Sequence, residues 1–265
     1  MNNPLISIVT INFNNASGLR KTLESVQKQK FSDYEHIIVD GNSTDESVNV
    51  IKEFLNDENY AKHVTWWCSE KDKGIYNAMN KGIVHTNGMW IYILNSGDIL
   101  VQDVFNQVQK FLINNELKII YGAVDCIVND KFVNTACLSA DYLDQGMIPH
   151  QGTFIPKKLH DEIGFYDESF KILADRDLML KMKNSGIEFS HIPVIIALYD
   201  GEGVSSSNSK ILNQENNRII KKYNLKKEKI SIKIFKSVIK LLLPGFLLIL
   251  IKFVIKVLKD FLKRT

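Results

Sequence analysis

The segment Ile91–Asp98, with the sequence IYILNSGD, ends an apolar run in a small polar turn that carries one carboxylate. An apolar run followed by Ser and Gly is typical of a buried strand that leads into a tight turn. In an α/β sheet, ligands bind at the carboxyl ends of such strands, so we expect Asp98 to point into solvent there. One carboxylate suits a divalent cation shared with a diphosphate, because magnesium takes few protein carboxylates and completes its shell with water and phosphate. The alternative is an ordinary turn that contains an Asp.

A second pair of carboxylates, Asp175 and Asp177, lies in the stretch ILADRDLMLKM. Leucine and methionine residues recur there at helical spacing, which predicts an amphipathic helix. Residues two apart on a helix point to different faces, so only one of these carboxylates can face a cleft. The alternative role for a carboxylate in the first turn is to stabilise the helix dipole.

Two further strands bring polar side chains to the same edge of the predicted sheet. Residues 5–15 (LISIVTINFNN) form a β-branched strand that opens into an Asn-rich loop, and residues 34–47 (YEHIIVDGNSTDES) repeat this pattern. In the second segment Asp40 ends the strand, and the polar residues 43–45 can cap the helix that follows. Residues 69–83 (SEKDKGIYNAMNKGI) then place Asp72 in a loop before a helix.

In order and spacing, these segments resemble the family 2 glycosyltransferases of the GT-A fold, from about Leu5 to Ser207. The chain looks most like the branch that builds bacterial exopolysaccharides, capsules and O-antigens. Where many relatives have Asp-x-Asp, this chain has NSGD, so only Asp98 can bind metal as a carboxylate. The matching segments are SIVTINFNN, VDGNSTDES, EKDKGIYNAMNKGI, LNSGD, HQGTFIPKKL, GFYDESF, ILADRDLMLKM and GEGVSSS.

The resemblance implies a nucleotide pocket at the ends of the first strands. Asp40 would accept a hydrogen bond from the base, and Asp72 would lie against the same nucleoside. Thr10 and Asn12 would frame the pocket. Each has a structural alternative, since Asp40 can cap the next helix and Thr10 can be an ordinary strand residue.

The resemblance also implies catalytic roles. Asp98, through Mg²⁺ or Mn²⁺, would hold the diphosphate and neutralise charge on the leaving group. The family pattern selects Asp175 as the general base, which takes the proton of an acceptor hydroxyl while its oxygen attacks the anomeric carbon with inversion. Asp177 then has a structural role. His150 and Gln151 would begin a strand, QGTFI, and contact the donor or acceptor sugar; the alternative is a loop pair that satisfies local backbone groups.

Composition bounds the class of protein. A chain of 265 residues can bury one substantial core. Its three cysteines lack metal spacing and are expected to be reduced, and no signal-peptide pattern precedes Leu5, so secretion is not expected. No GxGxxG follows a strand and no GxxxxGK[ST] occurs, which argues against dinucleotide dehydrogenases and P-loop kinases.

The charge is asymmetric along the chain. Residues 224–265 hold 11 Lys or Arg and two Asp or Glu, a net charge of +9, against −6 for residues 1–223. Lysines recur there every three or four residues on both sides of Pro244, which predicts two basic amphipathic helices. The apolar run 241–251 is shorter than the roughly 20 residues that span a bilayer, so we expect the tail to lie on an anionic membrane surface. The alternatives are docking on another subunit, as in a homodimer, and an ordinary basic surface helix; nucleic acid is not an expected partner.

The sequence therefore predicts an α/β GT-A domain over residues 1–223, with a Rossmann-like mixed sheet flanked by helices, and a membrane-association tail over residues 224–265. We expect an inverting enzyme that moves one sugar from a nucleotide-sugar, a UDP-sugar, to a lipid-linked glycan at the cytoplasmic face of the plasma membrane. The signature QxxRW of processive synthases is absent, which favours a non-processive reaction. The alternatives are a nucleotidyltransferase that acts on sugar phosphates and a catalytically silent membrane adaptor with the same fold.

Overall fold

The structure is a computed structural model. It describes residues 3–113, 117–128, 131–201 and 208–225. Nearly all of these belong to one compact unit, Met1–Tyr223. The predicted amphipathic helices of the basic tail lie outside the described residues.

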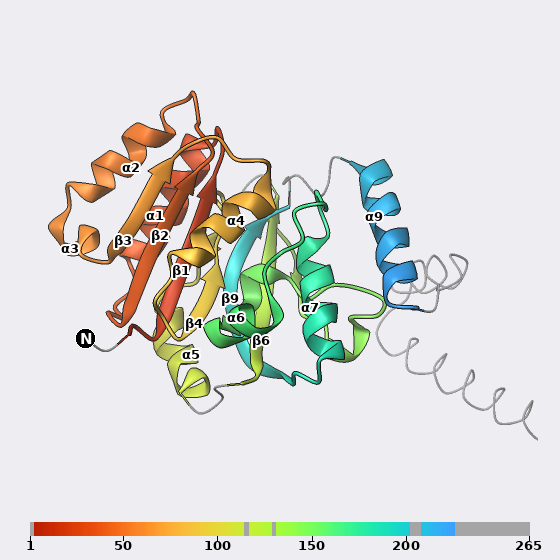
Figure 1. The fold of residues 1–265 in the computed structure, drawn as a ribbon. Coiled ribbons are helices and arrows are strands. Elements are labelled where there is room, and N and C mark those ends of the chain that lie inside the picture. The colour runs from red at the N-terminus through yellow and green to blue at the C-terminus, as the bar shows by residue number, and fades with distance from the viewer. Residues whose placement is uncertain (1–2, 114–116, 129–130, 202–207, 226–265) are drawn as a thin grey trace, which may run out of the picture. The chain divides into compact units, whose positions relative to one another are not determined.

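One mixed sheet of nine strands organises the described part of the chain (Figure 1). Its parallel half consists of β1 (Ile6–Asn12), β2 (Tyr34–Asp40), β3 (Val64–Ser69) and β4 (Trp90–Ile93). Its second half, in which most pairs are antiparallel, consists of β5 (Ile99–Leu100), β6 (Ile119–Val128), β7 (Lys131–Ala136), β8 (Thr153–Pro156) and β9 (Phe189–Asp200). The strands follow the order β3-β2-β1-β4-β8-β6-β9-β5, and β7 pairs with β6.

The register of the parallel strands brings their polar ends together. Every residue of β1 and β2 is buried, as expected for strands covered on both faces. Asn12 at the end of β1 is paired with Asp40 at the end of β2, and Asp40 is paired with Ser69 at the end of β3. Three polar side chains therefore meet at one edge of the sheet.

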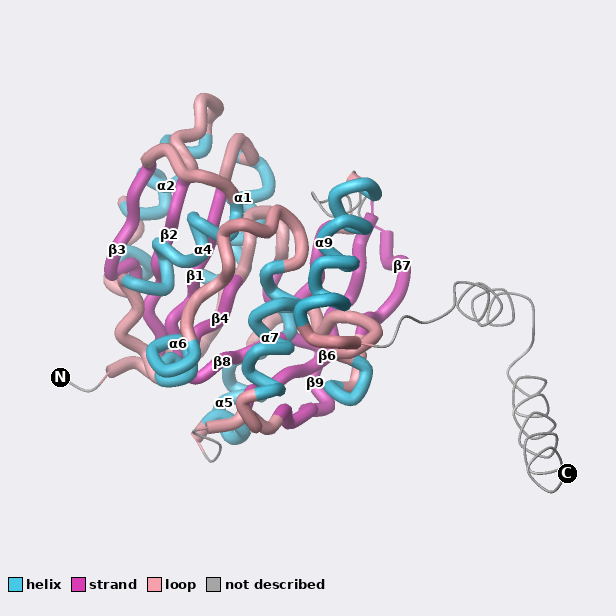
Figure 2. The backbone as a smooth tube through the Cα atoms, turned by 45° about the vertical axis from the view of Figure 1, so that its right-hand side comes forward, coloured by secondary structure: helices cyan, strands magenta, loops and turns pink. Residues whose placement is uncertain are grey.

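Helices cover both faces of the sheet. On one face, α1 (Ala16–Gln27), α2 (Ser47–Leu55), α3 (Glu58–Ala61) and α5 (Val104–Leu112) join the main core with alternate strand residues such as Ile6, Ile8 and Ile38. On the other face lies α4 (Ile75–Val84), which approaches so closely that a Cβ added to Gly82 would be 2.3 Å from Val9 Cγ1. In the view of Figure 1, α6 (Lys157–Ile163) and α7 (Ala174–Asn184) lie on this same side, and Figure 2 shows the arrangement after rotation.

The mixed sheet flanked by helices confirms the predicted α/β fold class. The last described helix, α9 (Ser209–Lys222), is tied to α7 by side-chain contacts. None of the helices in the described ranges has the length and apolar character that a membrane span requires.

Two local predictions differ from the structure. Residues His150–Gly152 of the predicted strand QGTFI form a short 3₁₀ turn, and the strand begins only at Thr153. The turn is fixed because Tyr92 Oη donates to the Gln151 carbonyl at 2.7 Å and Gly152 sits against the Gly122 backbone, where a Cβ would be 2.8 Å from the carbonyl oxygen.

The second difference is at the start of α2. Of the residues expected to cap this helix, Asp45 accepts the Ser47 N–H at 3.0 Å, whereas Ser43 donates its hydroxyl to Asp40 instead. Ser43 does not cap the helix because its hydroxyl donates to the buried carboxylate of Asp40 at the end of β2.

Candidate active site

A buried threonine of α1, Thr22, makes two hydrogen bonds to the turn that carries Asp98. Thr22 Oγ1 donates to the Asp98 carbonyl at 2.7 Å and accepts the Gly97 N–H at 3.0 Å. Gly97 has a φ of 103°, in the region that favours glycine. The turn is therefore held from below by α1, and its shape requires glycine at this position.

Asp98 is only 5% exposed, so the expectation that it points into solvent is wrong. The chain continues directly from Asp98 into β5, which pairs with β9, so the turn is part of the sheet rather than a loop that extends from it. The carboxylate lies close enough to Tyr92 for its charge to act on the phenol. Burial, and secondly the charge of Asp98, raise the pKa of Tyr92 well above its ordinary value.

Asp175 is 4% exposed in the first turn of α7, and side chains from two other elements contact it. His150 Nδ1 lies 3.4 Å from Asp175 Oδ2, and Tyr76 Oη lies 3.4 Å from Asp175 Oδ1. Tyr76 also donates to the Ile172 carbonyl at 2.5 Å. Burial, and secondly the charge of Asp175, raise the pKa of Tyr76. The tyrosine therefore remains a protonated donor beside the carboxylate.

His150 joins Asp175 to the Asp98 turn. Its Nε2 atom lies 3.0 Å from Asn95 Nδ2, and Asn95 is three residues before Asp98. An amide nitrogen can only donate, so Nε2 accepts and Nδ1 carries the proton toward Asp175 in the neutral ring. Two sequence segments that lie far apart, NSGD and ADRD, are thus brought to one place through His150.

Asp177 lies apart from this group, on another face of α7. Both of its oxygens are 2.8 Å from Lys222 Nζ of α9. The structure thus separates the two carboxylates as the helical spacing requires, with Asp175 beside His150 and Asp177 in an ion pair.

Asp40 is fully buried, and its carboxylate already accepts four hydrogen bonds. The donors are Asn12 Nδ2 at 2.8 Å, the Ser43 N–H at 2.9 Å, the Ser43 hydroxyl at 2.6 Å and the Ser69 hydroxyl at 2.6 Å. Asp40 and Asn12 therefore hold the loop after β2 in place through these hydrogen bonds.

The surface of that loop is formed by other residues. A Cβ added to Gly41 would be 2.6 Å from Asp72 Oδ2 and 3.2 Å from the Phe13 ring, so both side chains converge over this glycine. Phe13 is 64% exposed. The sequence indicated Asp72, and Gly41 as a turn residue, but Phe13 was missed; the signal that could have found it was an aromatic residue inside an Asn-rich loop.

Thr10 and Gln151 do not join either group through their side chains. Thr10 is fully buried, with its hydroxyl 2.8 Å from His36 Nε2, and His36 Nδ1 is 2.7 Å from Tyr60 Oη. Burial lowers the pKa of His36 to about 3, so this ring is neutral. Gln151 contributes its backbone carbonyl to Tyr92.

The residues of the Asp98 turn fit a hard divalent cation. Asn95 Oδ1 is buried without a hydrogen-bond partner, and together with a carboxylate it offers the oxygen ligands that Mg²⁺ and Mn²⁺ prefer. Among the described residues, no group of three or more His, Cys, Asp or Glu side chains is arranged to hold a metal. A metal at this turn would therefore rely on few protein ligands.

Comparison with known proteins gives consistent matches. The sequence model described as Glycosyl transferase family 2 matches residues 7–173. An uncharacterized glycosyltransferase of Mycobacterium tuberculosis is 33% identical over 185 residues, which cover 67% of this chain and 68% of the relative. A PGL/p-HBAD biosynthesis glycosyltransferase of Mycobacterium bovis is 29% identical over 206 residues, which cover 76% of this chain and 78% of the relative.

Solved structures share the fold at low sequence identity. A fragment of S. aureus TarS in complex with UDP-GlcNAc has a TM-score of 0.68 and 14% identity, over 86% of this chain and 69% of that chain. The mannosyltransferase PcManGT from Pyrobaculum calidifontis, in complex with GDP-Man and Mn²⁺, has a TM-score of 0.58 and 13% identity, over 74% of this chain and 57% of that chain. A longer TarS structure is covered over only 43% of its length.

Proposed function

Because the chain belongs to glycosyltransferase family 2, we propose that it transfers one sugar from a UDP-sugar to a hydroxyl group of a lipid-linked glycan, with inversion at the anomeric carbon. One observation carries this proposal. The contacts from Asn95 through His150 to Asp175 join the turn expected to hold the donor diphosphate to a buried carboxylate that can act as a base.

Asp175 is proposed to accept the proton of the acceptor hydroxyl. The hydroxyl oxygen then forms a bond to the anomeric carbon while the bond from that carbon to the diphosphate oxygen breaks. His150 Nδ1 faces Asp175 Oδ2, and the Tyr76 hydroxyl, which donates to the Ile172 carbonyl, lies beside Asp175 Oδ1. The two side chains are proposed to orient Asp175 toward the acceptor. His150 is thereby proposed to orient the general base, Asp175, in addition to making the sugar contact expected from the sequence.

The nucleoside is proposed to lie over Gly41, between Phe13 and Asp72. An exposed aromatic ring provides a surface on which a base can stack, and a carboxylate beside it can accept hydrogen bonds from base or ribose. Asp40 and Asn12 support this surface from below. The complex of TarS with UDP-GlcNAc favours a uridine nucleotide as the donor.

Asp98 and Asn95 are proposed to hold a Mg²⁺ or Mn²⁺ ion against the donor diphosphate. When bound, such an ion neutralises the negative charge that develops on the leaving group. The structure of PcManGT with GDP-Man and Mn²⁺ supports a metal in this fold.

Two observations support the proposed acceptor and the proposed attachment to a membrane. One relative is named for PGL/p-HBAD biosynthesis, which favours a role in assembling bacterial surface glycans. Residues 224–265 combine a net charge of +9 with long aliphatic runs, which favours attachment to the inner face of an anionic membrane.

A donor screen tests the proposal directly. The full-length chain is incubated with UDP-sugars and GDP-sugars, with Mn²⁺ or with a chelator, and thermal stabilisation and donor hydrolysis are measured. We expect one or more UDP-sugars to stabilise the protein and to be hydrolysed slowly, only when metal is present. Stabilisation by GDP-sugars alone would overturn the uridine assignment, and no response to any nucleotide-sugar would favour the silent adaptor.

A further inference from the structure

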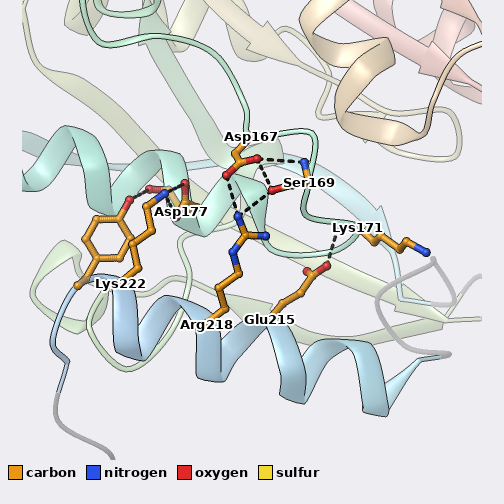
Figure 3. A network of polar contacts seen from close by, with 8 residues as sticks. Asp167, Ser169, Lys171, Asp177, Glu215, Arg218 and Lys222 are labelled. Atoms are coloured by element: carbon orange, nitrogen blue, oxygen red, sulfur yellow. Dashed lines mark hydrogen bonds and ion pairs between the residues drawn. The ribbon is translucent and has the colours of Figure 1, made fainter.

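Helix α9 packs along the segment that leads into the proposed base. Figure 3 shows three of its side chains, Glu215, Arg218 and Lys222, reaching the stretch 167–177. Arg218 Nη2 donates to Asp167 at 3.2 Å and to Ser169 at 2.8 Å, and Lys222 pairs with Asp177. These two residues attach α9 through contacts with side chains, whereas Glu215 binds the backbone.

Glu215 accepts three consecutive backbone N–H groups. Its Oε1 atom is 2.6 Å from Lys171 N, and its Oε2 atom is 3.0 Å from both Ile172 N and Leu173 N. The glutamate is 8% exposed, so water cannot readily replace these bonds. Leu173 is the N-cap residue of α7 and has no capping side chain of its own. Glu215 therefore places a negative charge beside the start of α7 and accepts the N–H groups of its N-cap residue and of the two residues before it.

The peptide group between Ile172 and Leu173 links Glu215 to Asp175. Its N–H, that of Leu173, is held by Glu215, and its carbonyl, that of Ile172, accepts the hydroxyl of Tyr76. The same hydroxyl reaches Asp175 Oδ1 at 3.4 Å. A shift of this peptide would move both the anchor of Tyr76 and the first turn of α7. A chain of contacts therefore joins Glu215 to the carboxylate, although Glu215 does not touch it.

We propose that Glu215 is a positioning residue for the sugar-transfer step: by fixing the backbone of residues 171–173, it holds Asp175 and Tyr76 in the orientation needed to accept the acceptor proton. This inference rests on the proposed role of Asp175 as the base. A misplacement of a catalytic group by about 1 Å can lower a rate by on the order of 100-fold. The effect should fall on kcat, because the proposed nucleoside surface at Phe13 and Asp72 lies on other loops.

The test compares Glu215→Ala and Glu215→Gln with the matched control Arg218→Gln in the full-length chain. The control removes the contacts of Arg218 with Asp167, Ser169 and the Phe170 ring, none of which involves residues 171–173 directly. We expect Glu215→Ala to lower kcat by about 10- to 100-fold with the donor KM changed less than about threefold. Glu215→Gln keeps an acceptor oxygen and should recover part of the loss, whereas Arg218→Gln should lower Tm with kcat nearly unchanged. Rates are compared per folded molecule, below the Tm of each variant.

A double-mutant cycle with Asp175→Asn separates positioning from a merely structural role. If Glu215 acts through the base, Glu215→Gln should have almost no further effect on the residual rate of Asp175→Asn. Additive losses, or equal losses of kcat in Glu215→Gln and Arg218→Gln, would overturn the proposal. So would an unchanged kcat in Glu215→Gln, which decides the matter even where Glu215→Ala does not fold. If Asp175→Asn itself leaves kcat unchanged, the proposed base fails rather than the positioning role alone.

Discussion

Asp175 and Asp177 are two residues apart, and both are almost completely buried, but their partners differ. Asp175 contacts His150 and Tyr76 and accepts the Arg176 N–H at 2.8 Å, whereas Asp177 forms a close ion pair with the ammonium group of Lys222. A carboxylate whose charge is balanced by lysine is a poor proton acceptor, because protonation would leave the lysine unpaired. This difference in environment favours Asp175 as the proposed base.

Replacing each carboxylate by its amide tests this assignment. We expect Asp175→Asn to lower kcat by about 100-fold or more with donor affinity nearly unchanged, because the amide keeps the shape but cannot accept a proton. Asp177→Asn should lower Tm, since it breaks the pair with Lys222, and should affect kcat much less. Steady-state kinetics with a fixed acceptor measure both effects. The opposite ranking of the two variants would show that the base is Asp177.

A test of Asp98 as a metal ligand requires a conservative replacement, because the residue is buried and a larger change would disturb the fold. We expect Asp98→Asn to weaken Mn²⁺-dependent stabilisation by the donor by at least about tenfold in metal concentration, because an amide oxygen is a much weaker ligand than a carboxylate. Thermal shift at increasing Mn²⁺ concentration measures this, and the Tm without metal serves as the control for folding. Metal-dependent turnover equal to that of the wild type would contradict a ligand role.

At the scale of elements, the Asp98 turn depends on α1 through Thr22. Thr22→Val keeps the shape but leaves the Gly97 N–H and the Asp98 carbonyl without their partner, which costs about 1–3 kcal/mol of unfolding free energy. We expect this variant to need more Mn²⁺ for half-maximal activity, because the turn that carries Asp98 is loosened.

The matched control is Thr86→Val. Thr86 is also buried and donates to a backbone carbonyl, that of Ile83 at 2.7 Å, but it lies just after α4 rather than at the turn. It should lose stability without changing the metal requirement. Equal metal requirements in the two variants would mean that Thr22 contributes only to folding.

At the scale of the whole molecule, a prediction concerns the basic tail, which lies outside the described residues. Removing residues 230–265 leaves α9, Glu215 and Lys222 in place, because the helix ends at Lys222. We therefore expect the truncated chain to retain donor hydrolysis and transfer to a short water-soluble acceptor, but to lose most activity on a lipid-linked acceptor.

Flotation with anionic vesicles measures the membrane part of this prediction. The full-length chain should float, with a salt-sensitive and a salt-resistant fraction, because lysine attraction is screened by salt whereas apolar burial is not. Neutral vesicles serve as the control. If the truncated chain floats as well as the full-length chain, docking on a second subunit becomes the better explanation of the tail.

The sequence by itself determined the local features of this protein. The runs of β-branched residues in β1 and β2, the helical spacing around Asp175 and the glycines at tight turns are patterns of neighbouring residues, and the structure confirms the α/β class that they predict. The order of the motifs also indicated the family, which the matched family model confirms. The division at residue 223, the tail and the identity of the donor stay predictions.

Only the tertiary structure decided which side chains act together. His150 and Asp175 are 25 positions apart, and Asn95 is 55 positions from His150, so their contacts depend on the order of the strands rather than on any local pattern. The same holds for the burial of Asp98 and for the four donors that bind the Asp40 carboxylate. It holds most clearly for Glu215, because a glutamate in an amphipathic helix gives no sign in the sequence of the distant backbone that it holds. A local pattern fixes the period of an element, whereas the partner of a buried polar group is fixed by the packing of the whole chain.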